Sequence, residues 1–109
     1  MSNGCLGKGV TIANTLVKIY EVPAAGVSFA STSVLLLNTG VAVATVKIAI
    51  GVTAIPSAAD YIDSNMELPA NGGSGERNCL IMGPGEKLFV QGSSANVVVR
   101  VQGLEETIT

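Results

Sequence analysis

The stretch that most constrains the fold is residues 33–50, SVLLLNTGVAVATVKIAI. Over 45–50, TVKIAI, larger apolar side chains alternate with polar or smaller ones. This is the period-two pattern of a β-strand with one buried face. The Asn-Thr-Gly sequence at 38–40 suits a turn, because glycine adopts positive φ without strain. The stretch therefore predicts two strands joined by a hairpin, with the rest of the chain supplying neighbouring strands.

Similar short apolar segments recur along the chain, separated by proline- and glycine-rich turns such as Gly83-Pro84-Gly85-Glu86. Together they predict strands at 15–22, 27–31, 34–37, 41–52, 67–68, 77–82, 87–91 and 96–102. With Ser57 as a cap, residues 57–62 can hold one helical turn or a loop, and 69–75 reads as a surface loop. Turn signals about every 8–12 residues are typical of a sandwich or barrel. We predict an all-β fold, a single antiparallel β-sandwich of jelly-roll or Ig-like type with about seven or eight short strands.

A chain of 109 residues is the size of one domain. Residues 1–9 show no periodicity and contain several glycines, which predicts an extended N-terminal arm. The sandwich is expected over 10–106 and a C-terminal tail over 107–109.

The composition indicates an apolar surface. Charged residues make up 13% of the chain, against roughly 25% in an average globular protein, and mean hydropathy is +0.51. Exposed apolar patches usually mark contact surfaces, so assembly with other subunits is expected. The four consecutive apolar residues at 34–37 predict a strand with one face in the core and the other under a loop or a neighbouring subunit. The predicted interface residues are Cys5, Leu6, Val34, Leu35, Leu36 and Leu37.

Several function classes lack the residues they need. The net charge is −2 and the cations are scattered singly, which argues against nucleic acid as a partner. The chain has no histidine, so neither a Ser-His-Asp nor a Cys-His catalytic set can form, and we expect no enzyme. No run of 18 apolar residues predicts a transmembrane helix, and the N-terminus has no signal-peptide pattern.

The two cysteines and one acidic segment are the remaining candidates for chemistry. Cys5 and Cys79 have no partner at zinc-ligand spacing, so they are either free thiols or a disulfide, within the chain or between subunits. Asp60 and Asp63 could contribute oxygen ligands to Ca²⁺, but a solvated acidic loop explains them more simply. We expect no metal and no cofactor.

Five segments in a fixed order resemble small β-sandwich accessory virion proteins of tailed bacteriophages. They are LLNTG at 36–40, ATVKIAI at 44–50, AADYI at 58–62, GPGEKL at 83–88 and NVVVRVQGLEE at 96–106. The resemblance covers about residues 14 to 106, and the cysteines are not part of the shared pattern.

This resemblance implies a non-enzymatic structural protein of the virion and leaves its position in the head, neck or tail open. The low charge, the high aliphatic content and the N-terminal arm lead us to expect a capsid decoration or cement protein that binds and stabilises the assembled head lattice. The resemblance implies location in the virion, assembled in the host cytoplasm. The implied partners are the major capsid protein or other virion proteins, with a homo-oligomer expected and a trimer favoured. The alternative is a tail-fibre, collar or baseplate module that binds a receptor or carbohydrate at a loop tip carrying Asp60, Tyr61 and Asn71.

Overall fold

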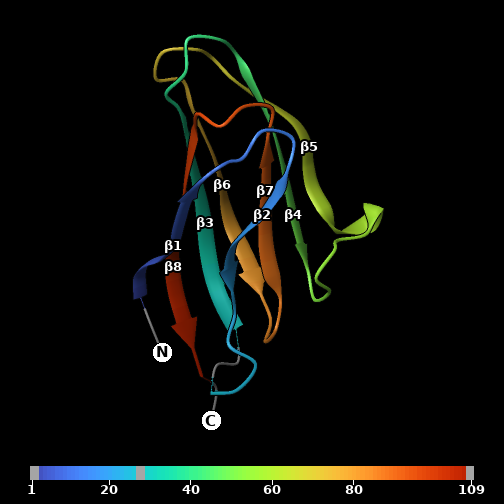
Figure 1. Cartoon of the computed structure of the whole chain (residues 1–109). Helices are drawn as coiled ribbons and strands as arrows, with labels where there is room; N and C mark the ends of the chain where they lie inside the picture. Colours follow the sequence, from blue (N-terminus) through green and yellow to red (C-terminus); the bar gives the residue numbers. More distant parts are fainter. Residues whose placement is uncertain (1–2, 27–28, 108–109) are drawn as a thin grey trace.

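The computed structural model describes residues 3–26 and 29–107 (Figure 1). Eight β-strands and one short 3-10 helix, η1 (Ala58–Asp60), make up this part of the chain. The strands are β1 (Asn3–Val10), β2 (Leu16–Glu21), β3 (Phe29–Asn38), β4 (Ala44–Gly51), β5 (Tyr61–Leu68), β6 (Ser74–Met82), β7 (Lys87–Gly92) and β8 (Val97–Glu106). The predicted all-β sandwich is confirmed.

The strands form two four-stranded antiparallel sheets. Sheet I has the order β1-β8-β3-β6, and sheet II has the order β2-β7-β4-β5. Consecutive strands alternate between the sheets, except β4 and β5, which pair with each other. This alternation is the strand order of a jelly roll and excludes the Ig-like alternative.

The core between the sheets is aliphatic. Val97, Val99 and Val101 on β8 are fully buried, while Val98 and Arg100 between them are exposed. β3 shows the same alternation, and β4 shows it as far as Ile48, after which Ala49 is also buried. The predicted period-two pattern thus identifies the inward faces over most of their length. The other fully buried large side chains include Ile48, Leu68, Met82, Leu88, Val22, Val34, Val46 and Val90.

The predicted hairpin at 38–40 is wrong. β3 lies in sheet I and β4 in sheet II, so residues 39–43 cross from one sheet to the other. The buried Asn38 side chain stabilises this crossing: its Nδ2 donates to the carbonyls of Ala42 (2.8 Å) and Leu68 (3.1 Å), and its Oδ1 accepts from the Gly40 N–H (2.9 Å). A local turn signal does not reveal which sheet the next strand joins.

The turn at 83–86 likewise connects sheet I to sheet II and is not a hairpin between paired strands. Its backbone is tied to the segment after β2. The Val22 N–H donates to the Glu86 carbonyl (2.9 Å), and the Gly85 N–H donates to the Val22 carbonyl (3.0 Å). The tight turn itself is confirmed by the hydrogen bond from the Glu86 N–H to the Gly83 carbonyl (3.2 Å).

The predicted N-terminal arm is part of the sandwich in its described portion. β1 pairs antiparallel with β8 and forms one edge of sheet I, with a bulge between Cys5 and Gly7. The boundary placed at residue 10 is therefore wrong, and residues 1–2 lie outside the described part. η1 is the single helical turn considered for 57–62, and β5 extends the predicted short strand at 67–68 back to Tyr61. β3 is one strand of 10 residues where two were expected, at 27–31 and 34–37, and residues 27–28 lie outside the described part.

Side-chain bonds close the two open sides of the sandwich. On one side, the Tyr20 hydroxyl of β2 donates a buried hydrogen bond to the Glu105 carboxylate of β8. On the other side, Arg77 of β6 forms an ion pair with Asp63 of β5. Each bond joins an edge strand of sheet II to sheet I, so the two sheets are fixed relative to one another.

Candidate functional site

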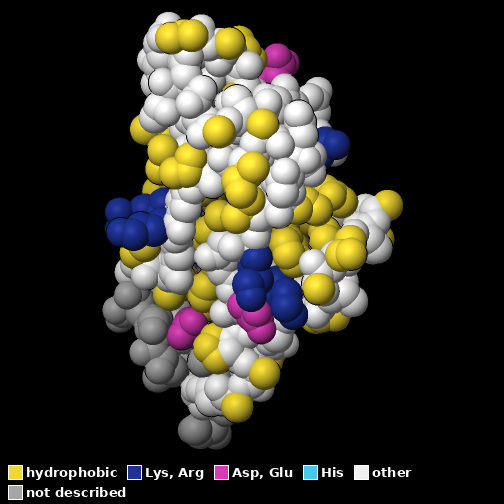
Figure 2. All heavy atoms as spheres, in the orientation of Figure 1, with side chains coloured by type: hydrophobic (Ala, Val, Ile, Leu, Met, Phe, Trp, Pro, Cys, Tyr) yellow, Lys and Arg dark blue, Asp and Glu magenta, His cyan; other side chains and the backbone are white. Residues whose placement is uncertain are grey.

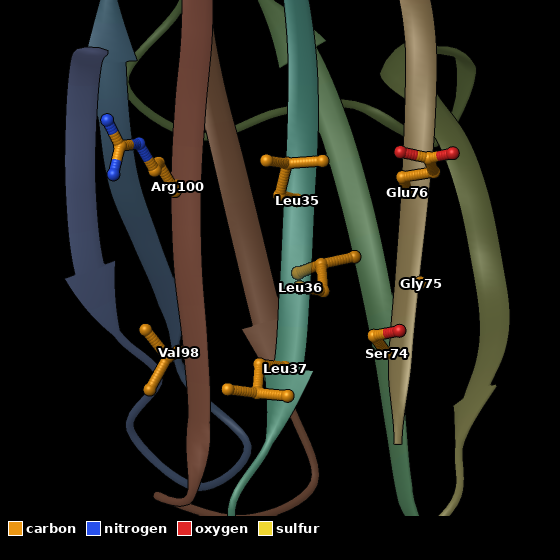
Figure 3. Close-up of a pocket in the computed structure, with 8 residues that line it drawn as sticks. All are labelled: Leu35, Leu36, Leu37, Ser74, Gly75, Glu76, Val98 and Arg100. Carbon is orange, nitrogen blue, oxygen red and sulfur yellow. The ribbon is translucent and has the colours of Figure 1, made fainter. Parts of the chain in front are cut away.

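A groove of about 550 Å³ runs along the outer face of sheet I (Figure 3). Leu35 and Leu37 of β3 lie in its middle, between β8 and β6. Gly75 lacks a side chain and lines the β6 side. The predicted interface segment 34–37 is thus divided: Val34 and Leu36 are buried in the core, while Leu35 and Leu37 line the groove.

The strand register orders the outer face of sheet I into rows of neighbouring side chains, running from β1 through β8 and β3 to β6. The first row holds Val10, Val98, Leu37 and Ser74. The second row holds Lys8, Arg100, Leu35 and Glu76. Figure 3 shows the β8, β3 and β6 members of both rows. Cations therefore flank the groove on one side and a carboxylate flanks it on the other.

Apolar side chains of this face are open to solvent in the chain as described. Val10 is 52% exposed, Leu37 41% and Val98 38%. Ile81 and Leu104 on the same face are also exposed. Of the predicted interface residues nearer the N-terminus, Cys5 is exposed on β1 and Leu6 packs against the core. No loop of the described residues covers the groove, so the alternative of a neighbouring subunit stays a prediction.

A second apolar surface lies at one end of the sandwich. Four loops meet there: 11–15, 39–43, 69–73 and 93–96, and none contains Asp, Glu, Lys or Arg. We call this surface the uncharged end. Val41 is 89% exposed, and Val43 and Ile12 are each 58% exposed. Figure 2 shows hydrophobic side chains reaching this end, at the top of the view, with one acidic side chain beside them and the visible Lys and Arg side chains lower down.

Backbone hydrogen bonds tie the four loops of the uncharged end together. Asn71 N–H donates to the Gly40 carbonyl (2.8 Å), and Thr39 N–H donates to the Asn96 carbonyl (2.9 Å). The first loop joins through Thr11, whose N–H donates to the Val97 carbonyl (2.9 Å). The Asn38 side chain described above adds bonds between the loops at 39–43 and 69–73. Such cross-linked loops lose little conformational entropy on binding, which favours recognition.

The residues of the alternative loop-tip site do not come together. Asp60 and Tyr61 lie where β5 begins, whereas Asn71 lies beyond its end. A strand of eight residues spans roughly 25 Å, so one small ligand cannot contact both groups. Tyr61 does line a hollow of about 480 Å³ with Lys47 and Asp63.

The two acidic residues considered for Ca²⁺ have protein partners. The Asp60 carboxylate accepts from the Ser57 N–H (2.9 Å) in the capping box of η1, and Asp63 is paired with Arg77. Among residues 3–26 and 29–107 no cluster of three metal-ligating side chains occurs. No helix in this part of the chain is long and apolar enough to cross a membrane.

The disulfide considered as an alternative to two free thiols does not form within the chain. Cys5 and Cys79 are both free and exposed. β1 and β6 are the opposite edges of sheet I, three strand spacings or roughly 14 Å apart. A disulfide needs Cα atoms within about 7 Å, so only a bond between subunits stays open.

Sequence reasoning missed the uncharged end. Its signal was present as four segments without charged residues, but they are far apart in the sequence. Only the strand order shows that they share one end of the molecule. Val10 and Val98 were likewise not predicted as interface residues. Only the strand register shows that they lie in one row with Leu37.

The alternating order of the eight strands defines the chain as a jelly-roll β-sandwich. No family model matches the chain, and no curated protein matches its sequence. Among solved structures, a chain from the crystal structure of the T13 IBDV viral particle is similar, with a TM-score of 0.54 and 11% identity over 94% of this chain and 29% of that chain. The Anabaena sensory rhodopsin transducer is similar over 88% of this chain and 100% of its own, with 20% identity and a TM-score of 0.47.

This chain spans less than a third of the IBDV chain that it matches, because the alignment covers 29% of that chain. At 11% identity the likeness is one of fold. That fold is the β-sandwich, which the resemblance in sequence also implied.

Proposed function

We propose that the chain is a non-enzymatic structural protein of a bacteriophage virion, a decoration or cement protein that binds the assembled head lattice through its uncharged end. The observation that carries the proposal is the uncharged end itself: ordered loops that present Val41, Val43 and Ile12 to solvent. The likeness in fold to a chain of a viral particle supports the same reading. The major capsid protein or another virion protein is the proposed partner.

The binding mechanism is burial of apolar surface against neighbouring subunits. Specific interfaces bury about 1,200–2,000 Å², and many copies on one particle add avidity. Loops without charged residues avoid the cost of desolvating unpaired ions in such an interface. Residues 3–10 are not a free arm that could reach a neighbouring subunit in this mechanism, because they pair with β8.

The experiment compares charge insertions at the two ends of the sandwich. Val41→Glu with Val43→Glu places carboxylates on the uncharged end, whereas Val52→Glu with Ile55→Glu places them on the loop after β4, at the opposite end. All four residues are exposed, so each substitution should change the free energy of unfolding by no more than about 0.5 kcal/mol. Head particles assembled without the chain are incubated with each protein and sedimented.

We expect the Val41/Val43 variant to lose particle binding and the Val52/Ile55 variant to keep it. Mass spectrometry of fractionated virions then measures the copy number of the native chain. Equal binding by both variants would contradict docking through the uncharged end. Recovery of the chain in tail or collar fractions alone would favour the tail-fibre, collar or baseplate alternative.

A further inference from the structure

The outer face of sheet I is complementary to a second copy of itself. Its second row runs from Lys8 and Arg100 on one side, through Leu35, to Glu76 on the other. We propose that two copies of the chain pair face to face through this surface, about a two-fold axis parallel to β3. The occupant of the groove is thus a second copy of the same chain. This interface does not depend on the proposed virion role.

The axis determines which residues meet. A two-fold axis parallel to the strands keeps each row in register and reverses the order of the strands. β1 then lies over the partner's β6, and β8 over the partner's β3. Lys8 comes opposite the partner's Glu76, Val98 opposite the partner's Leu37, and Arg100 opposite the partner's Leu35. Each ion pair and each apolar contact occurs twice, as an isologous interface requires.

Other axes do not match the charges. A two-fold axis in the interface but perpendicular to the strands keeps β1 over the partner's β1 and reverses the rows. Lys8 and Arg100 then lie in the same half of the interface as the partner's Lys8 and the partner's Arg100. Glu76 lies in the other half, where the partner supplies no cation. Complementary charges favour a defined partner and orientation, so the parallel axis is selected.

The area and chemistry of the face suit such a pair. Four strands of about ten residues cover roughly 19 by 33 Å, so two copies bury on the order of 1,200 Å². This is at the lower limit of a specific interface. Aligned sheets pack about 10 Å apart with side chains interdigitating. The groove over Gly75 gives room for the partner's side chains.

The positions of the two cysteines allow the geometry of the proposed dimer to be tested by cross-linking. Cys5 pairs in register with Gln102, which pairs with Ser33, and the β6 bulge leaves Asn78 and Cys79 together opposite Ser33. The cysteines therefore occupy opposite ends of one row, and both are exposed. The two-fold axis brings Cys5 over the partner's Cys79.

A short bismaleimide should cross-link the native chain into a covalent dimer. Cys5→Ser and Cys79→Ser should each form no cross-linked dimer alone, because like cysteines lie on opposite sides of the interface. Mixing the two single variants should restore a cross-linked heterodimer. A cross-linked dimer from either single variant alone, or none from the native chain, would overturn the proposal.

Charge reversal provides an independent measurement. In sedimentation velocity, Lys8→Glu should weaken dimerisation roughly tenfold by placing a carboxylate over the partner's Glu76. The double variant Lys8→Glu with Glu76→Lys should restore it, and Lys47→Glu on sheet II should leave it unchanged. A native chain that is monomeric or trimeric at every concentration would contradict the proposal. Failure here leaves particle binding by the uncharged end intact.

Discussion

Asn38 shows how one side chain directs the path of the chain between the sheets. Its amide bonds carbonyls at Ala42, Leu68 and Pro69, and these belong to segments that the sequence keeps far apart. The residue was visible in the sequence only as part of a turn. Its burial depends on long-range neighbours, which a local pattern does not contain.

Asn38→Ala should therefore destabilise the fold by about 3 kcal/mol, because buried carbonyls lose their donors. The matched control is Asn65→Ala, an exposed asparagine on β5, with an expected change within about 0.5 kcal/mol. Urea unfolding followed by circular dichroism measures both. Similar midpoints for the two variants would show that the Asn38 amide does not hold the crossing.

Tyr20 makes the stability of the fold depend on pH in the alkaline range. Burial raises the pKa of Tyr20 well above its ordinary value of 10.0, and the hydrogen bond and charge of Glu105 raise it further. A folded-state pKa above the unfolded value means that the folded chain binds more protons above pH 10. The stabilisation is therefore complete below pH 10 and decreases as the pH rises beyond it.

Tyr20→Phe should lower stability at neutral pH by about 1–3 kcal/mol, because the buried Glu105 carboxylate loses this donor. It should also flatten the loss of stability above pH 10. Tyr61→Phe, at the start of β5, is the control that keeps the native alkaline slope. Thermal unfolding as a function of pH measures both effects, and an unchanged slope in Tyr20→Phe would refute this assignment.

At the scale of elements, the sequence predicted most strands that carry an apolar or alternating run, including the edge strand β2. β3, β4, β7 and β8 are all internal to their sheets and carry long apolar or alternating runs. β1 and β5 are edge strands, so they need fewer apolar residues and their sequences, NGCLGKGV and YIDSNMEL, resemble loops. The sequence thus predicted the fold class and the edge strands β2 and β6, but not β1 and most of β5.

The glycines of β1 test whether it is a strand or an arm. A Cβ at Gly7 would lie 2.3 Å from the Ile19 carbonyl oxygen of β2, whereas one at Gly9 would meet only the tip of the Ile19 side chain, at 3.2 Å. Gly7→Ala should cost about 2–3 kcal/mol and Gly9→Ala less than about 1 kcal/mol. Equal melting temperatures for the two variants would indicate a free arm.

At the scale of the whole molecule, the candidate surfaces follow from the strand order and register. The run at 34–37 marked the middle of the outer face of sheet I, and the register added Val10 and Val98 around it. The uncharged end needed the topology, because its loops are separated by whole strands. The low content of charged residues predicted contact surfaces. Only the fold shows that the candidates are the outer face of sheet I and the uncharged end.

The position and orientation of the chain on a particle test its proposed role most directly. Cryo-electron microscopy of intact virions should show the jelly roll on the head, with the loops at 39–43 and 69–73 against the capsid lattice. The Val52 end should point toward solvent. A reconstruction with the uncharged end in solvent, or virions that lack the chain entirely, would contradict the account.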